Sequence, residues 1–324
     1  MANTFLKPEK LIAQGLGLLQ RELLLPRLVV RRGIADYQGA KNDTINIRIP
    51  SILKGREYEW RTRNTAITTD DLKEYSVPVT LDKHPYSAVG ITDEELTLDI
   101  VDWGEQVARP QIRAVAELLE SYIATAMVNA NYRHTVSYEQ QNPDVEGKDY
   151  AFYRAAVKAR KYLNQENVPA AGRKLLVGAN VEEAALNSAH LIDVNTSGDE
   201  SVLRDAVIGR VAGFEVIGNC NSIDPDFAVA FHPTAFALGN VAPVVPDGAK
   251  AGATLEFESL AMRWIRDYDS DHLRDRSVYS SFAGSTSVED GRNLAPTGEE
   301  VYGELTKENV RAVKLDFTPF GDGS

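Results

Sequence analysis

Residues 103–130 read WGEQVARPQIRAVAELLESYIATAMVNA, a run in which apolar side chains recur every three or four positions. This spacing is typical of a long amphipathic helix with one buried stripe. At about 1.5 Å per residue, such a helix would be roughly 40 Å long. Pro110 has no backbone N–H, so we expect it either to kink the helix or to mark its start. The expected buried stripe consists of Val107, Ile112, Val115, Ala116, Leu119, Tyr122, Ile123, Ala126 and Met127.

The segment before this helix predicts an arm and a long hairpin. Residues 8–32 open with a leucine-rich helical pattern that Pro26 ends, and we expect this arm to pack on its own body or on a neighbour. The alternation in Thr44–Pro50 predicts a strand, with partner strands at Tyr75–Thr80 and Tyr86–Ile91.

Between the first two of these strands, residues 51–73 are polar and charged, and such a segment cannot form a core of its own. It is therefore either a solvated loop or a projection that reaches another subunit. Aromatic and arginine side chains are enriched at the hot spots of protein interfaces. On this basis the candidate inter-subunit contacts are Arg31, Arg32, Tyr58, Trp60, Arg61 and Arg63.

The chain after the long helix predicts a compact α/β module inserted between pieces of another unit. A second amphipathic helix is expected over 149–165, with Phe152, Ala156, Ala159 and Leu163 on its buried face. The module that follows should contain a strand at 175–178, a helix at 181–191, a strand at 206–217 with a turn at Gly209 or Gly213, a strand at 227–231, a short helix at 233–238 and a loop at 241–252. After it, a long strand over 254–267 is expected to pair with 273–282, and 310–317 is expected to form a closing strand.

Composition and charge exclude several classes of protein. The 324 residues carry a net charge of −12, and nucleic-acid binding depends on an excess of Lys and Arg. The single cysteine, Cys220, excludes an intramolecular disulfide and a thiolate metal cluster. No apolar run approaches the roughly 20 residues that a membrane-spanning helix needs.

The sequence contains no motif for catalysis or for a cofactor. The P-loop, the dinucleotide fingerprint, the nucleophile elbow and the zinc helix are absent, and the five histidines are scattered. Asp267–Asp271 begins like a calcium loop, but His272 stands where that loop needs glycine and Val278 where it needs glutamate. We therefore expect no catalytic residue, no cofactor-binding residue, no metal ligand and a protein that is not an enzyme.

The order of an arm, a polar hairpin, a long helix, an α/β module and returning strands resembles the major capsid proteins of tailed bacteriophages, which have an α+β, HK97-like fold. The opening, ANTFLKPEKLIAQGLGLLQRELLLPRLVVRR, and the return strands, LAMRWIRDYDSDHLRDRSVYSSFAGSTSVED, resemble the coat-protein branch typified by the Salmonella phage coat, as found in actinobacteriophages. The resemblance implies five parts: an N-terminal arm at 1–35, an extended loop at 36–97, a peripheral domain with the spine helix at 98–174, an axial domain at 175–252, and peripheral return strands with the C-terminus at 253–324.

The same resemblance implies self-assembly into hexamers and pentamers of an icosahedral shell. The shell would enclose phage double-stranded DNA without sequence-specific binding, and it would be assembled in the host cytoplasm and found in the virion. The implied partners are further copies of the chain, a portal, an optional decoration protein and a separate scaffolding protein, since only about 35 residues precede the extended loop. Some relatives cross-link an extended-loop lysine to a neighbour's asparagine, and Lys54 and Lys73 lie in the matching region.

Two alternatives remain open at this point. The first keeps the fold and changes the role to an encapsulin-type nanocompartment shell that encloses a cargo enzyme. The second is a soluble α/β enzyme with its site at strand ends near Val177–Asn180 or Ile217–Asn221.

Overall fold

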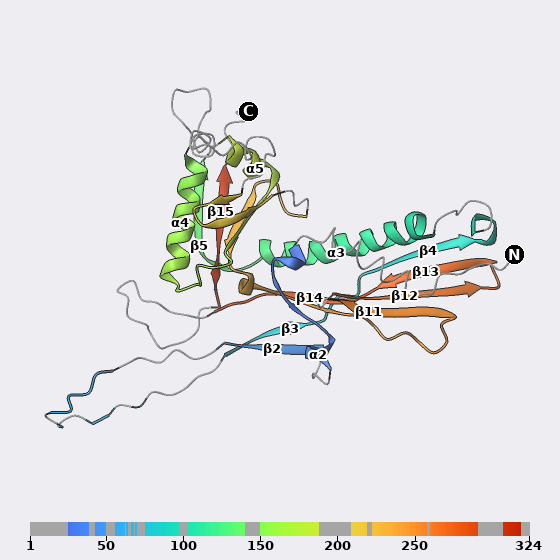
Figure 1. Cartoon of the computed structure of the whole chain (residues 1–324), viewed down its shortest axis with the longest axis horizontal. Coiled ribbons are helices and arrows are strands. Elements are labelled where there is room, and N and C mark those ends of the chain that lie inside the picture. The colour runs from blue at the N-terminus through green and yellow to red at the C-terminus, as the bar shows by residue number, and fades with distance from the viewer. Residues whose placement is uncertain are drawn as a thin grey trace.

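The computed structural model describes residues 25–38, 43–49, 56–61, 63, 66–67, 69, 75–96, 103–139, 150–187, 209–218, 222–257, 260–290 and 307–318. Within these residues the molecule is elongated (Figure 1). The long helix α3 lies along a flat sheet that extends to the right. A second sheet with helices α4 and α5 stands at the left, and the hairpin of β2 and β3 projects below it.

The long helix has the predicted place, and seven of the nine residues of the predicted stripe are buried, while Tyr122 and Ala126 are half-buried. A π-helical turn, Gly104–Ala108, leads into α3, Arg109–Val128. Pro110 lies in the first turn of α3, where its missing N–H costs no helical hydrogen bond, so regular α-helix begins there. Ile112, Val115 and Leu119 are buried against the flat sheet, whereas Ile123 and Met127 are buried against the second sheet. One helix therefore joins both halves of the molecule.

The flat sheet under α3 is antiparallel, in the order β11-β12-β13-β4. Its strands are β11, Ala251–Phe257; β12, Leu260–Asp269; β13, Arg274–Ser280; and β4, Tyr86–Thr92. The pairing predicted between 254–267 and 273–282 is confirmed for β12 and β13. The single strand predicted over 254–267 is wrong, because two strands cover this range: β11 ends at Phe257, and β12 begins at Leu260 and pairs antiparallel with it. Strand alternation alone cannot reveal this division.

The hairpin prediction is half right. Strand β2, Thr44–Ile49, pairs with β3, Tyr75–Thr80, but β4 pairs with β13 and not with β3. In this pairing Ile91 lies opposite Asp275 of β13, and it is the one β4 side chain that is buried. Burial of this residue gives a physical reason for β4 to join the flat sheet.

A buried polar network fixes α3 on the flat sheet. The Gln111 amide nitrogen donates to the backbone carbonyls of Ser277 at 2.9 Å and Ser87 at 3.2 Å. The Ser277 hydroxyl donates to the Gln111 carbonyl oxygen at 2.9 Å, and the Trp264 indole N–H donates to the Ser277 hydroxyl at 3.0 Å. All three side chains are buried, so a shift of the helix along the sheet would leave several polar groups without partners.

The second sheet has six strands in the order β5-β15-β9-β6-β8-β7 and mixes parallel with antiparallel pairs. Helices α4, Ala151–Gln165, and α5, Ala179–Leu186, contribute to the core on one face of this sheet. The other face packs against the end of α3. The strands are β5, Tyr132–Glu139; β15, Asn309–Thr318; β9, Phe227–Phe231; β6, Lys174–Val177; β8, Phe214–Ile217; and β7, Arg210–Val211.

This sheet crosses the boundaries expected at 174/175 and 252/253. Strand β15 comes from the far end of the sequence, yet it lies between β5 and β9. Its residues Ala312, Val313 and Leu315 are buried, and burial of neighbouring residues on both faces is possible only inside a sheet. Strand β5, helix α4 and strand β15 are therefore part of the α/β unit.

Several smaller predictions can be scored as well. The predicted face of α4 is buried, and the turn predicted at Gly213 divides the expected 206–217 strand into β7 and β8, with φ angles of 51° at Ala212 and 88° at Gly213. The short helix expected over 233–238 is only a 3-10 turn, Pro233–Ala235. Residues Phe236–Val241 instead form the fully buried strand β10, because six consecutive buried positions suit a central strand.

Strand β10 is the centre of a third, three-stranded sheet, β1-β10-β14, built from β1, Val30–Arg32, and β14, Phe282–Ser287. Ahead of β1, the 3-10 turn Leu25–Arg27 begins the described part of the arm, and Leu25, Leu28 and Val29 are buried against the end of α3. Packing of the arm on its own body is thus confirmed for these residues, and residues 8–24 lie outside the described ones.

Candidate inter-subunit surfaces

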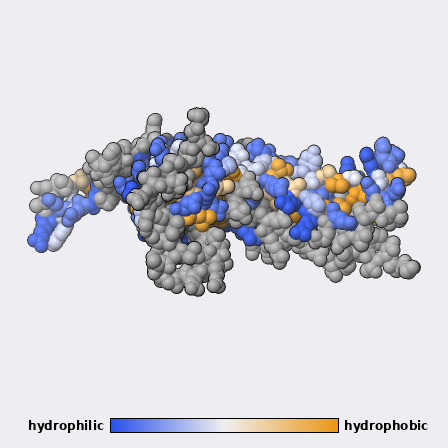
Figure 2. Space-filling view, turned by 90° about the horizontal axis from the view of Figure 1, so that it is seen from above, coloured by the Kyte–Doolittle hydropathy of each residue, from blue (hydrophilic) through white to orange (hydrophobic). Residues whose placement is uncertain are grey.

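The loop tip, defined as residues 56–61, 63, 66–67 and 69, lies far from the rest of the molecule (Figure 1). Its described residues are exposed, and the coloured atoms at the left end of Figure 2 are mostly hydrophilic. Three apolar or aromatic side chains are nevertheless exposed on it: Tyr58 at 41%, Trp60 at 66% and Ile67 at 78%.

Local contacts shape the loop tip. The Trp60 N–H donates to the Tyr58 carbonyl at 2.9 Å, and the Arg63 N–H donates to the Glu59 carbonyl at 3.1 Å. The Arg61 guanidinium lies 5.1 Å from the centroid of the Trp60 ring, a cation–π pair. Four of the six predicted contact residues, Tyr58, Trp60, Arg61 and Arg63, are thus brought together on one projection.

The other two predicted contacts, Arg31 and Arg32, lie on β1, far from the loop tip in sequence. The strand pairs in parallel with β10, with Arg31 opposite Leu238 and Arg32 opposite Gly239. Arg32 also lies 3.7 Å from the Asp36 carboxylate. The Asp36 carboxylate therefore neutralises part of the Arg32 charge within the arm itself.

Tyr37 fastens the arm to the base of the hairpin. Helix α2, Ile34–Tyr37, brings the Tyr37 ring against Gly239, and its hydroxyl donates to the Val79 carbonyl at 3.3 Å. Burial, followed by the nearby Asp36 charge, raises the pKa of Tyr37 to about 12. The hydroxyl therefore stays protonated and remains a donor at neutral pH.

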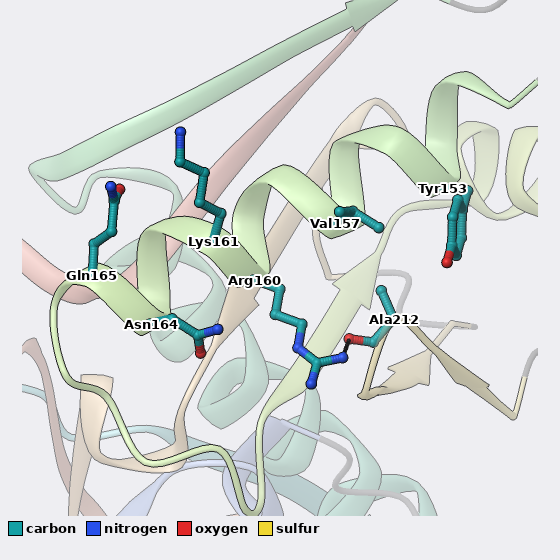
Figure 3. A pocket seen from close by; sticks show the side chains of 7 residues that line it. All are labelled: Tyr153, Val157, Arg160, Lys161, Asn164, Gln165 and Ala212. Carbon is teal, nitrogen blue, oxygen red and sulfur yellow. Dashed lines mark hydrogen bonds between the residues drawn. The ribbon is translucent and has the colours of Figure 1, made fainter.

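A groove lies along α4 beside the β7–β8 turn. Figure 3 shows Tyr153, Val157 and Arg160 on the side of the helix that faces Ala212, while Lys161 points away. The Arg160 guanidinium donates to the Ala212 carbonyl at 3.1 Å, and the groove has a volume of about 600 Å³. Burial lowers the pKa of Arg173, and the nearby positive charge of Arg160 adds to this effect.

The opposite charge gathers at the start of α5 and in the turn before β9. This acidic corner consists of Glu182, Glu183, Asp224 and Asp226. The Asn180 amide donates to the Asp226 carboxylate at 2.7 Å, and the Asp226 N–H donates to the Asp224 carboxylate at 3.0 Å. Gly178 packs directly against the backbone of Asp224, which leaves no room for a Cβ atom and holds the corner close to the sheet.

The segment that begins like a calcium loop is a turn between β12 and β13. One Asp269 carboxylate oxygen accepts from His272 at 2.9 Å and from Arg274 at 3.3 Å, and the other accepts from the Asp271 N–H at 3.1 Å. These donors occupy the carboxylate that a cation would need. Among the described residues no group of three or more His, Cys, Asp or Glu side chains could hold a metal ion.

Among the described residues, the strand ends suggested for an enzyme site are closely packed. Val177 is buried, Gly178 lies against Asp224 and Pro225, and Gly218 lies against the Glu182 carboxylate. Residues 219–221 lie outside the described part of the chain. In the part of the molecule that is described, no helix is long and apolar enough to cross a membrane.

Comparison with solved structures decides the fold. No protein-family model matches the sequence, and no curated protein matches it significantly. A structure from Mycobacterium phage Che8 aligns with 90% of this chain and 90% of its own, at 18% identity and a TM-score of 0.61. The capsid of the cyanophage P-SCSP1u aligns with 90% of this chain and 87% of its own, at 12% identity and a TM-score of 0.61.

The chain has the HK97-like capsid fold. The virus-like particle of Pyrococcus furiosus shares it more loosely, with 12% identity, coverage of 95% of this chain and 98% of its own, and a TM-score of 0.50. The α+β class and the capsid fold predicted from the sequence are therefore confirmed. The Salmonella-phage branch within the capsid fold stays a prediction.

The sequence-based interpretation missed the basic face of α4 and the acidic corner. The signal was present, because residues 151–165 contain four basic and no acidic side chains, whereas 179–187 and 222–226 contain four acidic and no basic ones. The net charge of the whole chain, −12, hides this separation.

Proposed function

We propose that this protein is the major capsid protein of a tailed bacteriophage and assembles into hexamers and pentamers of an icosahedral shell around double-stranded DNA. The observation that carries the proposal is the capsid fold over about 90% of the chain, together with a loop that projects away from every core of its own subunit. Exposed aromatic side chains on such a projection are best explained by burial against another subunit.

In this proposal the loop tip and the arm fasten neighbouring subunits. Tyr58, Trp60, Arg61 and Arg63 would contact the next copy, and Arg31 and Arg32 would contribute from β1. Many such contacts are collectively strong even where each is weak. The α/β unit of α4, α5 and the six-stranded sheet would lie near the ring axis, and the flat sheet with α3 would lie at the periphery.

The further partners and the location belong to the same proposal. A separate scaffolding protein, a portal and an optional decoration protein would take part in assembly in the host cytoplasm, and the finished shell would be part of the virion. Cross-linking through Lys54 or Lys73 would require an acidic pocket on a neighbour, and both lysines lie outside the described residues.

The test is expression of the full chain, alone and with a scaffolding protein from the same phage genome, followed by size-exclusion chromatography and electron microscopy. We expect closed particles with visible hexamers and pentamers. A chain that stays monomeric or dimeric under every condition would contradict the proposal.

The nanocompartment alternative is favoured by one observation, the similarity to the Pyrococcus furiosus virus-like particle. Its TM-score of 0.50 is lower than the 0.61 of the phage structures. Purified particles from infected or expressing cells distinguish the two roles, since a phage shell would contain DNA and a nanocompartment would contain a cargo enzyme.

A further inference from the structure

The exposed face of α4 carries charge that the described residues of its own subunit do not neutralise. Arg154, Lys158 and Lys161 are exposed, and among the described residues none of them forms an ion pair. Arg154 and Lys158 are four positions apart, as are neighbours on one helix face, and like charges at this spacing destabilise a helix. The arrangement therefore lowers the stability of the isolated subunit, and a partner of opposite charge would explain it.

The groove beside this face indicates what kind of partner fits. Its floor is apolar, formed by Tyr153, Ala212 and Val157, and the Val157 side chain is 43% exposed. Arg160 lines the groove, and its guanidinium is fixed on the Ala212 carbonyl. A nucleic-acid backbone presents mainly phosphate oxygens and small sugar rings to such a floor, whereas a protein surface supplies both carboxylates and larger apolar side chains.

The acidic corner on the same chain has the complementary composition. It presents four carboxylates near the exposed Pro225, and Glu183 and Asp224 are themselves exposed. In Figure 1 α4 stands at the left of the six-stranded sheet, and α5, which carries part of the corner, lies near its upper right. A rotation of one copy about a ring axis can thus bring the basic face of one subunit to the acidic corner of the next.

We infer that the basic face of α4 docks on the acidic corner, Glu182–Glu183 and Asp224–Asp226, of a second copy of this chain within a ring. This inference rests on the proposed shell function and assigns the residues of one ring contact. Head-to-tail contacts join two different surfaces of the same chain and close into rings, which is the geometry that a basic and an acidic surface on one subunit allow. Charge complementarity also fixes the order of subunits and speeds their encounter.

The experiment reverses each surface separately and then both together. Variant A is Lys158→Glu with Lys161→Glu, variant B is Glu183→Lys with Asp224→Lys, and variant AB carries all four changes. All four side chains are exposed, so circular dichroism should show unchanged folding. We expect the assembled fraction to fall by about tenfold or more in A and in B, and to recover in AB, because AB restores opposite charges across the contact.

A control changes net charge by the same amount as variant A but elsewhere. Arg113→Glu with Lys83→Glu alters exposed residues on α3 and before β4, and it should assemble like the wild type. Wild-type shells together with normal assembly of A and B would overturn this contact and leave the proposed function intact. Loss of assembly in A and B without recovery in AB would overturn the pairing of these two surfaces.

The nucleic-acid alternative has its own outcome. If A forms normal shells that retain less DNA, the face binds nucleic acid and the ring contact is wrong. A wild-type chain that never associates would overturn the proposed function and this contact with it.

Discussion

Helix α3 and the loop tip both carry large apolar side chains, but the two regions differ in how far these side chains are buried. In α3 the apolar stripe is buried by two sheets of the same subunit. In the loop tip Tyr58, Trp60 and Ile67 are exposed. Burial of a large apolar side chain contributes about 1.5–3 kcal/mol, so α3 stabilises the subunit, whereas the loop tip can gain this energy only from another molecule.

The polar groups of the two regions differ in the same way. Gln111 of α3 is buried and forms three hydrogen bonds within the subunit, through its amide nitrogen and its carbonyl oxygen. At the loop tip, the Arg61 guanidinium forms a cation–π pair with the neighbouring Trp60 ring, which is itself exposed. The comparison teaches that α3 stabilises its own subunit through buried contacts, whereas the loop tip keeps exposed aromatic side chains that a second molecule could bury.

The largest expected effect is a charge in the buried stripe of α3. Leu119→Asp would place a carboxylate where the native side chain is 1% exposed and belongs to an apolar cluster, so we expect a loss of more than about 4 kcal/mol. This is a large part of the 5–15 kcal/mol by which most domains are stable, and the chain should be insoluble or unfolded. Solubility and circular dichroism of the expressed chain measure the effect, and Ile123→Asp should behave alike.

The matched control for this change is the neighbouring residue. Leu118→Asp makes the same chemical change on the exposed side of α3, where Leu118 is 39% exposed. It should leave the chain folded. Equal damage from both substitutions would mean that the side of the helix does not matter, and the assignment of the stripe would be wrong.

An intermediate effect is expected from the polar network under α3. Gln111→Ala removes the acceptor of the Ser277 hydroxyl and leaves a cavity, so we expect a loss of about 2–4 kcal/mol. Chemical denaturation, followed by tryptophan fluorescence, to which the buried Trp264 contributes, measures the free energy of unfolding. Arg113→Ala on the same helix breaks an exposed ion pair with Glu117 and should cost less than about 0.5 kcal/mol. A Gln111 variant as stable as the Arg113 variant would show that the network does not hold the helix in place.

The comparison also explains which parts of the fold could be predicted from the sequence. Helices α3 and α4 follow from a period of three to four residues, and the β2 strand follows from strict alternation, because these signals are local. Strand pairing is not local. The partner of β4 and the central place of β15 depend on residues far apart in the sequence, and no periodicity encodes them or the pairing of β11 with β12.

The candidate surfaces divide along similar lines. Tyr58, Trp60, Arg61 and Arg63 could be found by residue type, because a polar projection with aromatic residues is unusual within a short stretch. The basic face of α4 could be identified only after the helix was placed in the fold, because the fold shows that Arg154, Lys158 and Lys161 face solvent. The acidic corner could be identified only from the fold, because its residues come from α5 and from the turn before β9. The Asn180–Asp226 hydrogen bond shows that these two segments lie together.

The smallest expected effect on subunit stability comes from the loop tip. Trp60 is 66% exposed, so Trp60→Ala should change the free energy of unfolding by less than about 0.5 kcal/mol, and Arg61→Ala should behave alike. Trp60→Ala should instead lower the stability of the shell, because a tryptophan buried at an interface commonly contributes about 2 kcal/mol or more to binding. The measurement is the midpoint of particle disassembly in denaturant, beside the unfolding midpoint of the isolated subunit. Leu118→Ala, an exposed apolar residue on α3, is the control that should move neither midpoint. An unchanged disassembly midpoint in the Trp60 variant would mean that the loop tip stays in solvent within the shell. An equal shift of the disassembly and unfolding midpoints would mean that the loop tip, like α3, packs on its own subunit.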